Sequence, residues 1–259
     1  MASAPSNALP LFYNELQPLS SQTHSSWKVR MLENAPFFAK AHAVPLTIEE
    51  FVIAQRFYPI VFSVGENPVP LALFGLNEGV NVFTDDNGQP TGNIYIPAYV
   101  RRYPFMLAKL RPDVDELSLC FDGTAGVLGD FDDGQPLFVD GEPTESVKNT
   151  LAFCEQFEQA GIRTGMFVQE LIHNKLLIDG EVTIEASGSD QPFVYRGFQI
   201  VSEERLKDLR GDVLRKMVQS GLLPLIHAHL FSLPLVRDIF AMQMEQGKAP
   251  AQSQAVPAA

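Results

Sequence analysis

The sequence predicts an α+β protein, with a mostly antiparallel sheet in the N-terminal half and helices with one β-hairpin in the C-terminal half. Two observations lead to this class. Short segments typical of strands come first along the chain, and longer segments of helical periodicity follow them. The chain also lacks the regular strand–helix–strand alternation that a parallel doubly wound sheet requires.

The length and composition allow one large globular domain. A chain of 259 residues, 46% of them hydrophobic, can bury about 70% of the surface that its unfolded form exposes. We expect a single domain over residues 9–242, with two lobes, 9–143 and 144–242, as the alternative. Residues 1–8 and 243–259 are expected to be disordered, because they lack the apolar periodicity of a packed element.

The first helix is predicted after Thr47. Thr47 and Glu50 have the spacing of a capping box, in which the two side chains satisfy backbone amides at a helix start. The helix should run for about ten residues and end before Tyr58-Pro59, because the residue ahead of a proline is pushed out of the α region. Strands are predicted next at 60–62, 69–76 and 80–84, with a hairpin-type turn at 86–88.

Two prolines shape residues 94–110. Pro97 can open a short helix, and Pro104 should end or kink that helix around Tyr103. Residues 117–122 then alternate, with apolar side chains at every second position. This alternation predicts one half-buried strand.

Two helices are predicted directly after residue 143. Thr144 can cap a helix that runs to Ala160, where Gly161 supplies a left-handed stop. Thr164 can start a second helix, which should end near residue 175.

A β-hairpin and further helices complete the chain. Strands 178–186 and 193–201 flank Ser187-Gly188-Ser189-Asp190, a strong hairpin signal. Ser202 should cap a charged helix. The remainder is predicted to be helical, with breaks at Gly211, at Gly221 to Pro224 and at Pro234.

The charge of the chain bears on its partners. A formal net charge of −12 and a pI near 4.8 argue against nucleic acid, whose nonspecific binding needs a basic footprint. An anionic membrane surface is disfavoured for the same reason. The expected partner is therefore a protein, a peptide or an amino-acid-like ligand, and the oligomeric state is left open.

The termini and apolar runs bear on localisation. The N-terminus lacks the basic start and apolar stretch of a secretory signal. The longest apolar candidate for a membrane span, residues 221–240, is interrupted by prolines, histidines and an arginine. We expect a cytoplasmic protein without membrane insertion, in which Cys120 and Cys154 stay reduced.

The strongest candidate for ligand binding is an arginine pair. The 26 residues from Asn87 to Pro112 contain four basic residues and no acidic one. Among them, Arg101 and Arg102 could bind a carboxylate or phosphate through paired hydrogen bonds, with Tyr99 and Tyr103 framing the ligand. The alternative is that one of the arginines pairs with a buried acid, such as Asp122, and only holds the fold together.

A second candidate lies on the predicted strand 117–122. Cys120 and Asp122 share its polar face, and Cys120 would be a nucleophile if His229 or His42 folded next to it. The alternative is that Cys120 fills apolar space, as most cysteines do.

Metal and cofactor sites are not predicted. His227 and His229 lie two residues apart on a predicted helix and therefore face different sides. Residues 113–145 hold ten acidic residues and no Lys or Arg, which suggests calcium or a basic partner. However, Asp130-Phe131-Asp132-Asp133-Gly134 places glycine at the fifth position of the loop, so the EF-hand pattern fails. The chain also lacks the common nucleotide-binding and hydrolase motifs.

Several short motifs are shared with a known family: Trp27, Tyr58 to Phe62, Tyr95 to Phe105, Cys120 to Asp122, Gly197-Phe198 and Ala228 to Leu230. On these residues the chain resembles the bacterial SapC family over roughly residues 9–242. The family usually has isoleucine where Phe121 stands and tyrosine where His227 stands, and the second departure weakens the case for a histidine pair.

The resemblance implies little about activity. The family's name comes from a link to bacterial surface-layer proteins, and its members are similar to proteins encoded near TonB-dependent receptors and tryptophan halogenases. We expect a nonenzymatic binding or accessory protein in surface-layer assembly or in peptide or amino-acid uptake and processing. The alternatives are an enzyme whose arginine pair holds a carboxylate-bearing or peptide substrate, and a structural surface-layer subunit. The candidate ligand-binding residues are Arg101, Arg102, Tyr99, Tyr103, Cys120, Asp122, His229 and Trp27.

Overall fold

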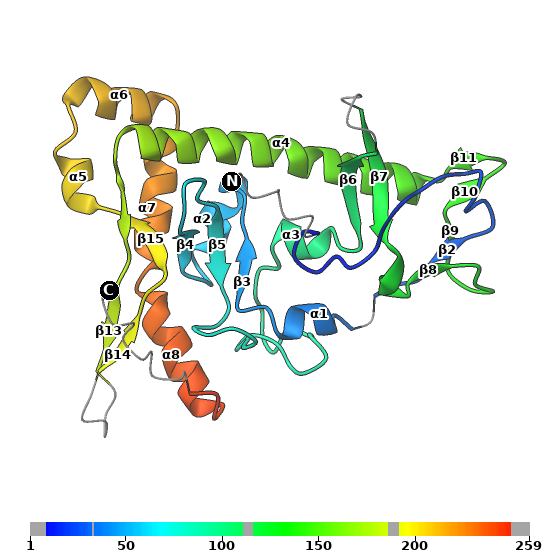
Figure 1. Ribbon diagram of the computed structural model, residues 1–259, viewed down its shortest axis with the longest axis horizontal. Helices are drawn as coiled ribbons and strands as arrows, with labels where there is room; N and C mark the ends of the chain where they lie inside the picture. The colour runs from blue at the N-terminus through cyan, green and yellow to red at the C-terminus, as the bar shows by residue number, and fades with distance from the viewer. Residues whose placement is uncertain (1–8, 33, 111–115, 186–191, 250–259) are drawn as a thin grey trace, which may run out of the picture. The chain divides into compact units, whose positions relative to one another are not determined.

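The computed structural model describes residues 9–32, 34–110, 116–185 and 192–249 (Figure 1). The chain forms two compact units. Unit 1 combines the chain up to Asn34 with Val100–Gln159, and unit 2 combines Ala35–Tyr99 with the chain from Ala160 onward. These units differ from the consecutive lobes 9–143 and 144–242, because strand pairing in unit 1 joins Leu16 to Asp122 across a long stretch of chain.

Unit 1 contains a three-stranded antiparallel sheet with the order β1-β7-β6. Its strands are β1 (Leu16–Pro18), β7 (Leu117–Asp122) and β6 (Phe105–Lys109). The strand predicted at 117–122 is therefore confirmed, but its last four residues are all buried, so both faces are covered and the strand is not half-buried. In the predicted helical segment, α3 covers only Ala98–Arg101 and β6 follows it.

Unit 1 also contains a second small sheet. Its order is β8-β2-β9, with β2 (Lys28–Val29) between β8 (Leu128–Gly129) and β9 (Gln135–Pro136). A hairpin of β10 (Phe138–Val139) and β11 (Glu142–Pro143) follows, and η2 (Gly123–Ala125) comes directly after β7. The buried core of unit 1 includes Leu107, Leu119, Phe121, Leu137 and Cys154.

Unit 2 is built on a five-stranded antiparallel sheet with the order β12-β15-β4-β5-β3. Its N-terminal strands are β3 (Ala43–Pro45), β4 (Ile60–Ser63) and β5 (Pro70–Leu73), which confirms two of the predicted strands. Its remaining strands, β12 (Leu177–Asp179) and β15 (Phe198–Val201), belong to the predicted hairpin.

The predicted hairpin is divided by glycines. Beyond β12 and β15, β13 (Val182–Ile184) pairs with β14 (Phe193–Tyr195). Gly180 and Gly197 separate the two pairings, and Gly197 has a φ of +92° that favours glycine. The turn predicted at 187–190 lies outside the described residues.

The strand predicted at 80–84 does not form. Asn81 Oδ1 accepts a hydrogen bond from Phe83 N–H at 2.9 Å, and such a local bond competes with a strand ladder. The turn that follows is confirmed. Gly88 has a φ of +79°, and its N–H donates to Asp85 O at 3.0 Å.

The helix predicted after Thr47 is shorter than expected. It consists of η1 (Ile48–Glu50) and α2 (Phe51–Ala54), preceded in the chain by α1 (Pro36–Ala39). Thr47 N–H donates to Glu50 Oε2 at 3.0 Å, as a capping box requires. Glu50 Oε1 also accepts from Tyr95 Oη at 2.9 Å and from Ala98 N–H at 2.7 Å, which ties the start of α3 to η1.

One long helix, α4 (Glu145–His173), replaces the two helices predicted on either side of Gly161. Gly161 has open space where a Cβ would stand and does not adopt a positive φ, so no left-handed stop forms. The Thr164 hydroxyl donates to Ala160 O at 2.7 Å and accepts from Ile48 N–H at 3.0 Å instead of capping a new helix. The first part of α4 belongs to unit 1 and the part from Ala160 to unit 2.

The C-terminal helices follow the predicted breaks. They are α5 (Glu203–Lys207), α6 (Gly211–Gln219), α7 (Leu222–Ser232) and α8 (Leu235–Glu245). Ser202 caps α5 by accepting from Arg205 N–H at 3.2 Å. The disordered tail was predicted from residue 243, but Gln243 is fully buried in α8 and accepts from Leu76 N–H at 2.7 Å. Residues 1–8 and 250–259, also predicted to be disordered, lie outside the described residues.

By length and composition alone, the stretch Leu222–Glu245 is apolar enough to cross a membrane. Its side chains Ile226, Val236 and Ile239 are buried in unit 2, and the buried helices of proteins in water pass the same test. The absence of membrane insertion therefore stays a prediction. The fold class itself is confirmed as α+β with antiparallel sheets, strands lying mostly in the N-terminal half.

Candidate functional site

The two predicted arginines have different surroundings within unit 1. Arg102 is 6% exposed, its Nη1 lies 3.3 Å from Glu158 Oε1, and its guanidinium carbon lies 4.2 Å from the centre of the Phe157 ring. Arg101 is exposed, and its guanidinium carbon lies 5.3 Å from the centre of the Phe153 ring. Arg102 is therefore buried against α4, whereas the side chain of Arg101 is exposed.

Asp122 is held by backbone groups of the N-terminal segment and of η2. Its carboxylate accepts from the backbone N–H groups of Asn14 at 3.0 Å, Glu15 at 3.2 Å and Thr124 at 2.9 Å. Burial alone would raise the pKa of Asp122, but these hydrogen bonds and that of the Thr124 hydroxyl lower it. Through these hydrogen bonds, Asp122 holds the N-terminal segment against β7.

The two predicted framing tyrosines do not act together. Tyr103 Oη donates to Asp122 Oδ2 at 3.2 Å, and its ring packs edge-on against Tyr13 at 5.4 Å. Burial, reinforced by the Asp122 charge, raises the pKa of Tyr103 to about 12. Tyr99 belongs to unit 2 and is 6% exposed, so its ring is not offered to a ligand.

Cys120 and His229 are both fully buried. Burial raises the pKa of the Cys120 thiol, which disfavours the reactive thiolate. Cys120 belongs to unit 1, whereas His229 and His42 belong to unit 2. The burial of Cys120 matches the apolar-filler interpretation.

His229 has a structural role in the sheet of unit 2. Its Nε2 accepts from Val201 N–H at 3.0 Å, and its Nδ1 donates to Ile60 O at 2.7 Å. The register of β15 and β4 pairs Gln199 with Phe62, so Val201 and Ile60 would pair two steps further along. The His229 ring bridges that pair, and burial lowers its pKa to about 4.

Trp27 packs inside unit 1. Its ring lies 4.4 Å from the ring of His24 and 5.9 Å from that of Phe121. Trp27 is therefore packed as part of the core beside β7.

An open groove of about 680 Å³ in unit 1 is lined by the predicted basic segment. Arg101, Tyr103 and Phe105 contribute to this groove, and so does the first part of α4 through Glu145 and Asn149. An adjoining hollow of about 870 Å³ shares part of the same wall. We call the two together the unit 1 trough; its shared wall consists of Val29, Arg30, Leu32, Val127 and Gln135.

The unit 1 trough carries charges of both signs. Exposed Arg101 supplies a guanidinium and exposed Glu145 a carboxylate, while Arg30 is paired with Asp133. Met31, which is 90% exposed, adds an apolar surface at the adjoining hollow. The remaining polar groups are neutral hydrogen-bonding side chains: Gln135, Ser146, Asn149 and Thr150.

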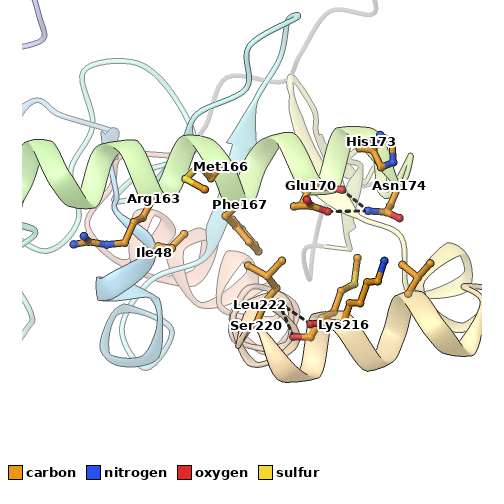
Figure 2. A pocket seen from close by; sticks show the side chains of 12 residues that line it. Ile48, Arg163, Met166, Phe167, Glu170, His173, Asn174, Lys216, Ser220 and Leu222 are labelled. Carbon is orange, nitrogen blue, oxygen red and sulfur yellow. Dashed lines mark hydrogen bonds between the residues drawn. The ribbon is translucent and has the colours of Figure 1, made fainter.

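A pocket of about 620 Å³ in unit 2 was not predicted from the sequence (Figure 2). Phe167 of α4 and Met217 of α6 line its apolar part and are almost fully buried, and Ile48 and Leu222 add to it. These residues come from three separate parts of the chain, so only the fold brings them together. The one available signal was the amphipathic pattern of α6, which places buried Met217 next to exposed Lys216.

The rim of this pocket is charged. Glu170 Oε2 lies 3.4 Å from Asn174 Nδ2, and Arg163 is paired with Glu49. Lys216 rises from α6 toward α4 in Figure 2, where Glu170 and Asn174 point toward it. Across the described ranges of the chain, no group of three or more His, Cys, Asp or Glu side chains is placed to hold a metal ion.

The fold and these sites define an α+β protein with two antiparallel-sheet units, each with an open, polar-rimmed hollow. The family model described as SapC matches residues 19–239, and the chain belongs to this family. The resemblance predicted from the sequence is thus confirmed. No curated protein and no solved structure matches the chain.

Proposed function

We propose that this SapC-family chain is a nonenzymatic binding or accessory protein whose unit 1 trough holds a peptide or amino-acid-like ligand. The observation that carries the proposal is that one open trough presents an exposed guanidinium, Arg101, and an exposed carboxylate, Glu145. A peptide with free ends has the complementary charges, and neutral amides and hydroxyls along the trough suit its backbone.

The arginine side of the trough fits a carboxylate. A guanidinium offers paired N–H donors in a planar fork that matches the two oxygens of a carboxylate. Phe153 lies against Arg101, and the next residue, buried Arg102, pairs with the partly exposed Glu158. Both contacts restrict the backbone and side chain of Arg101, which lowers the entropy cost of binding.

The enzyme considered as an alternative has less support. It would rely on Cys120 as nucleophile or on His229 as base, and both side chains are fully buried. Burial raises the pKa of Cys120 and lowers that of His229 to about 4, so each favours the neutral form. Binding without covalent chemistry is the function that these surroundings favour.

We propose that the protein acts in the cytoplasm, in support of surface-layer assembly or of uptake and processing of a peptide or amino-acid nutrient. The family membership supports the first setting, and the mixed charges of the trough are compatible with either.

The proposal is tested by isothermal titration with pools of mixed-sequence tripeptides. Free tripeptides should bind, and amidation of their C-termini should weaken binding about tenfold, because a hydrogen bond to a charged group is lost. Arg101→Gln should weaken binding of the free peptides by a similar factor. Arg56→Gln is the matched control, because Arg56 is also exposed and lies near an aromatic ring, Phe57, but in unit 2. Failure of every pool to bind, or equal binding of free and amidated pools, would refute the proposal.

A further inference from the structure

The pocket of unit 2 has the size and lining of a site for a small molecule. Its volume of about 620 Å³ lies within the range of about 300–1,000 Å³ typical of ligand pockets. Phe167 and Met217 are 1% and 2% exposed and provide a fixed apolar surface. Met166, which is 65% exposed, lies at the same pocket and can move to fit an apolar group.

Lys216, one residue before Met217, brings an ammonium group to the lining of the pocket. Its side chain is directed into the space between α6 and α4 (Figure 2). Within the described part of the chain, Lys216 Nζ makes no hydrogen bond or ion pair. An ammonium at the edge of an apolar pocket favours a ligand whose anionic group lies at the end of an apolar body.

The rim also carries Arg163, which is already paired, and Glu170, which would discriminate between ligands. The guanidinium of Arg163 is paired with Glu49, so it contributes less to an incoming anion. Glu170 accepts from Asn174 and faces the same space as Lys216. The carboxylate of Glu170 would repel a simple anion but attract a ligand that also carries an amine.

We propose that this pocket is a second binding site, for a small molecule that joins one carboxylate to an apolar body. The apolar body lies against Phe167 and Met217, and the carboxylate pairs with Lys216. Fatty acids and apolar amino acids share this chemistry, and Glu170 distinguishes between them. The site is independent of the proposed peptide ligand, because all its lining residues belong to unit 2.

The test is calorimetric titration of the full chain with octanoate, 1-octanol and phenylalanine. Octanoate should bind about tenfold more tightly than 1-octanol, because both have the same apolar body and only one is charged. Equal binding of the two would show an apolar hollow without an anion site and overturn the proposal. The lack of saturable binding by both octanoate and phenylalanine would overturn it as well.

Three variants locate the site. Lys216→Met should remove the preference for octanoate over 1-octanol, whereas Arg215→Met, on the same helix but outside the pocket, should keep it. Glu170→Gln should strengthen octanoate binding and weaken phenylalanine binding if the amino acid is the natural class. All three residues are exposed, so melting temperatures should not change. A preserved octanoate preference in Lys216→Met would contradict the assignment.

The two proposals fail separately. Arg101→Gln should leave octanoate binding unchanged, because Arg101 belongs to unit 1. Loss of octanoate binding in that variant would place the carboxylate site in the unit 1 trough and overturn the assignment to unit 2.

Discussion

At the residue scale, Arg101 and Arg102 are neighbours in the chain with different surroundings, one exposed and one buried. The sequence predicted a binding pair or a structural arginine and could not choose between them. The choice depends on Glu158 and Phe157 of α4, which lie far along the chain and contact Arg102. Because long-range contacts decide burial, the residue pattern alone identified the segment but not the role of each residue.

The first prediction therefore concerns Arg102. Arg102→Ala should lower the free energy of unfolding by about 2 kcal/mol, because it removes a buried guanidinium and leaves Glu158 without this partner. The cost stays below that of a fully buried pair, since the Glu158 side chain is 40% exposed. Urea denaturation measures the change.

Arg101→Ala is the matched control in this experiment. Its side chain is exposed, so the free energy of unfolding should change by less than about 0.5 kcal/mol. A larger loss for Arg101→Ala than for Arg102→Ala would contradict the division of roles.

The second prediction at this scale concerns His229 and pH. The pKa of His229 is about 4 in the folded protein and 6.5 in its ordinary state, so between these values the unfolded chain binds a proton that the folded one does not. Stability should therefore fall as the pH is lowered from about 6.5 to about 4, by at most about 1.4 kcal/mol per pH unit. Below about pH 4 the loss of stability due to His229 levels off. Protonation of Asp122, whose hydrogen bonds lower its pKa, reduces stability further only below its ordinary pKa of 3.8.

The measurement for His229 is urea denaturation at a series of pH values. His229→Gln should show a smaller loss of stability between pH 6.5 and 4, and a lower stability at pH 7, because the bridge between Val201 and Ile60 is disturbed. His227→Gln serves as the control on the same helix, since His227 stacks on Phe231 and is only half-buried. An unchanged pH dependence in His229→Gln would exclude His229 as its source.

At the element scale, the sequence predicted elements with strong local signals and missed those set by tertiary contacts. The strand at Ile60–Ser63, the cap at Ser202 and the turn at Gly88 each carry their own signal and are confirmed. The strand β6 was missed because two prolines and a short helix dominate the local pattern before it. It exists because β7 pairs with it along five residues.

The long helix α4 gives the clearest case of a local signal overruled. Gly161 and Thr164 resemble a helix end and a helix start, but both lie inside α4. Helices in folded proteins gain most of their stability from tertiary packing, and the Thr164 hydroxyl bonds to Ala160 O and Ile48 N–H from inside the helix. Residues packed on both sides of the glycine thus keep the helix continuous.

The third prediction follows from this arrangement. Gly161→Ala should raise the free energy of unfolding by about 0.5–1 kcal/mol, because alanine limits the unfolded chain and its Cβ meets open space. Gly88→Ala should lower it instead, since Gly88 has a φ of +79° and an added Cβ would lie 1.9 Å from Ala35 O. Thermal and urea unfolding measure both, and a destabilised Gly161→Ala would mean that the helix needs a break there.

At the scale of the whole molecule, composition predicted the fold class but not the way in which the chain is divided. Each unit is assembled from two separate stretches, and their pairing, such as Leu16 with Asp122, leaves no local trace in the sequence. For the same reason, the sequence predicted the candidate sites only in part. The sequence identified Arg101 but missed Glu145 and Lys216, whose importance depends on the residues that the fold places opposite them.

The fourth prediction concerns the net charge of −12, which the whole molecule carries. Like charges repel one another more strongly in the compact state than in the unfolded chain, so salt that screens them should stabilise the fold. The melting temperature should therefore rise as sodium chloride is increased from about 0.01 M to about 0.5 M, over which the screening length falls from about 30 Å to below 8 Å. Differential scanning calorimetry measures the change.

A triple variant, Glu66→Gln, Glu78→Gln and Asp86→Asn, neutralises three exposed acids and should show a smaller rise in melting temperature. A melting temperature that falls with salt would mean that the ion pairs at Arg30, Arg163 and Arg196 outweigh the overall repulsion.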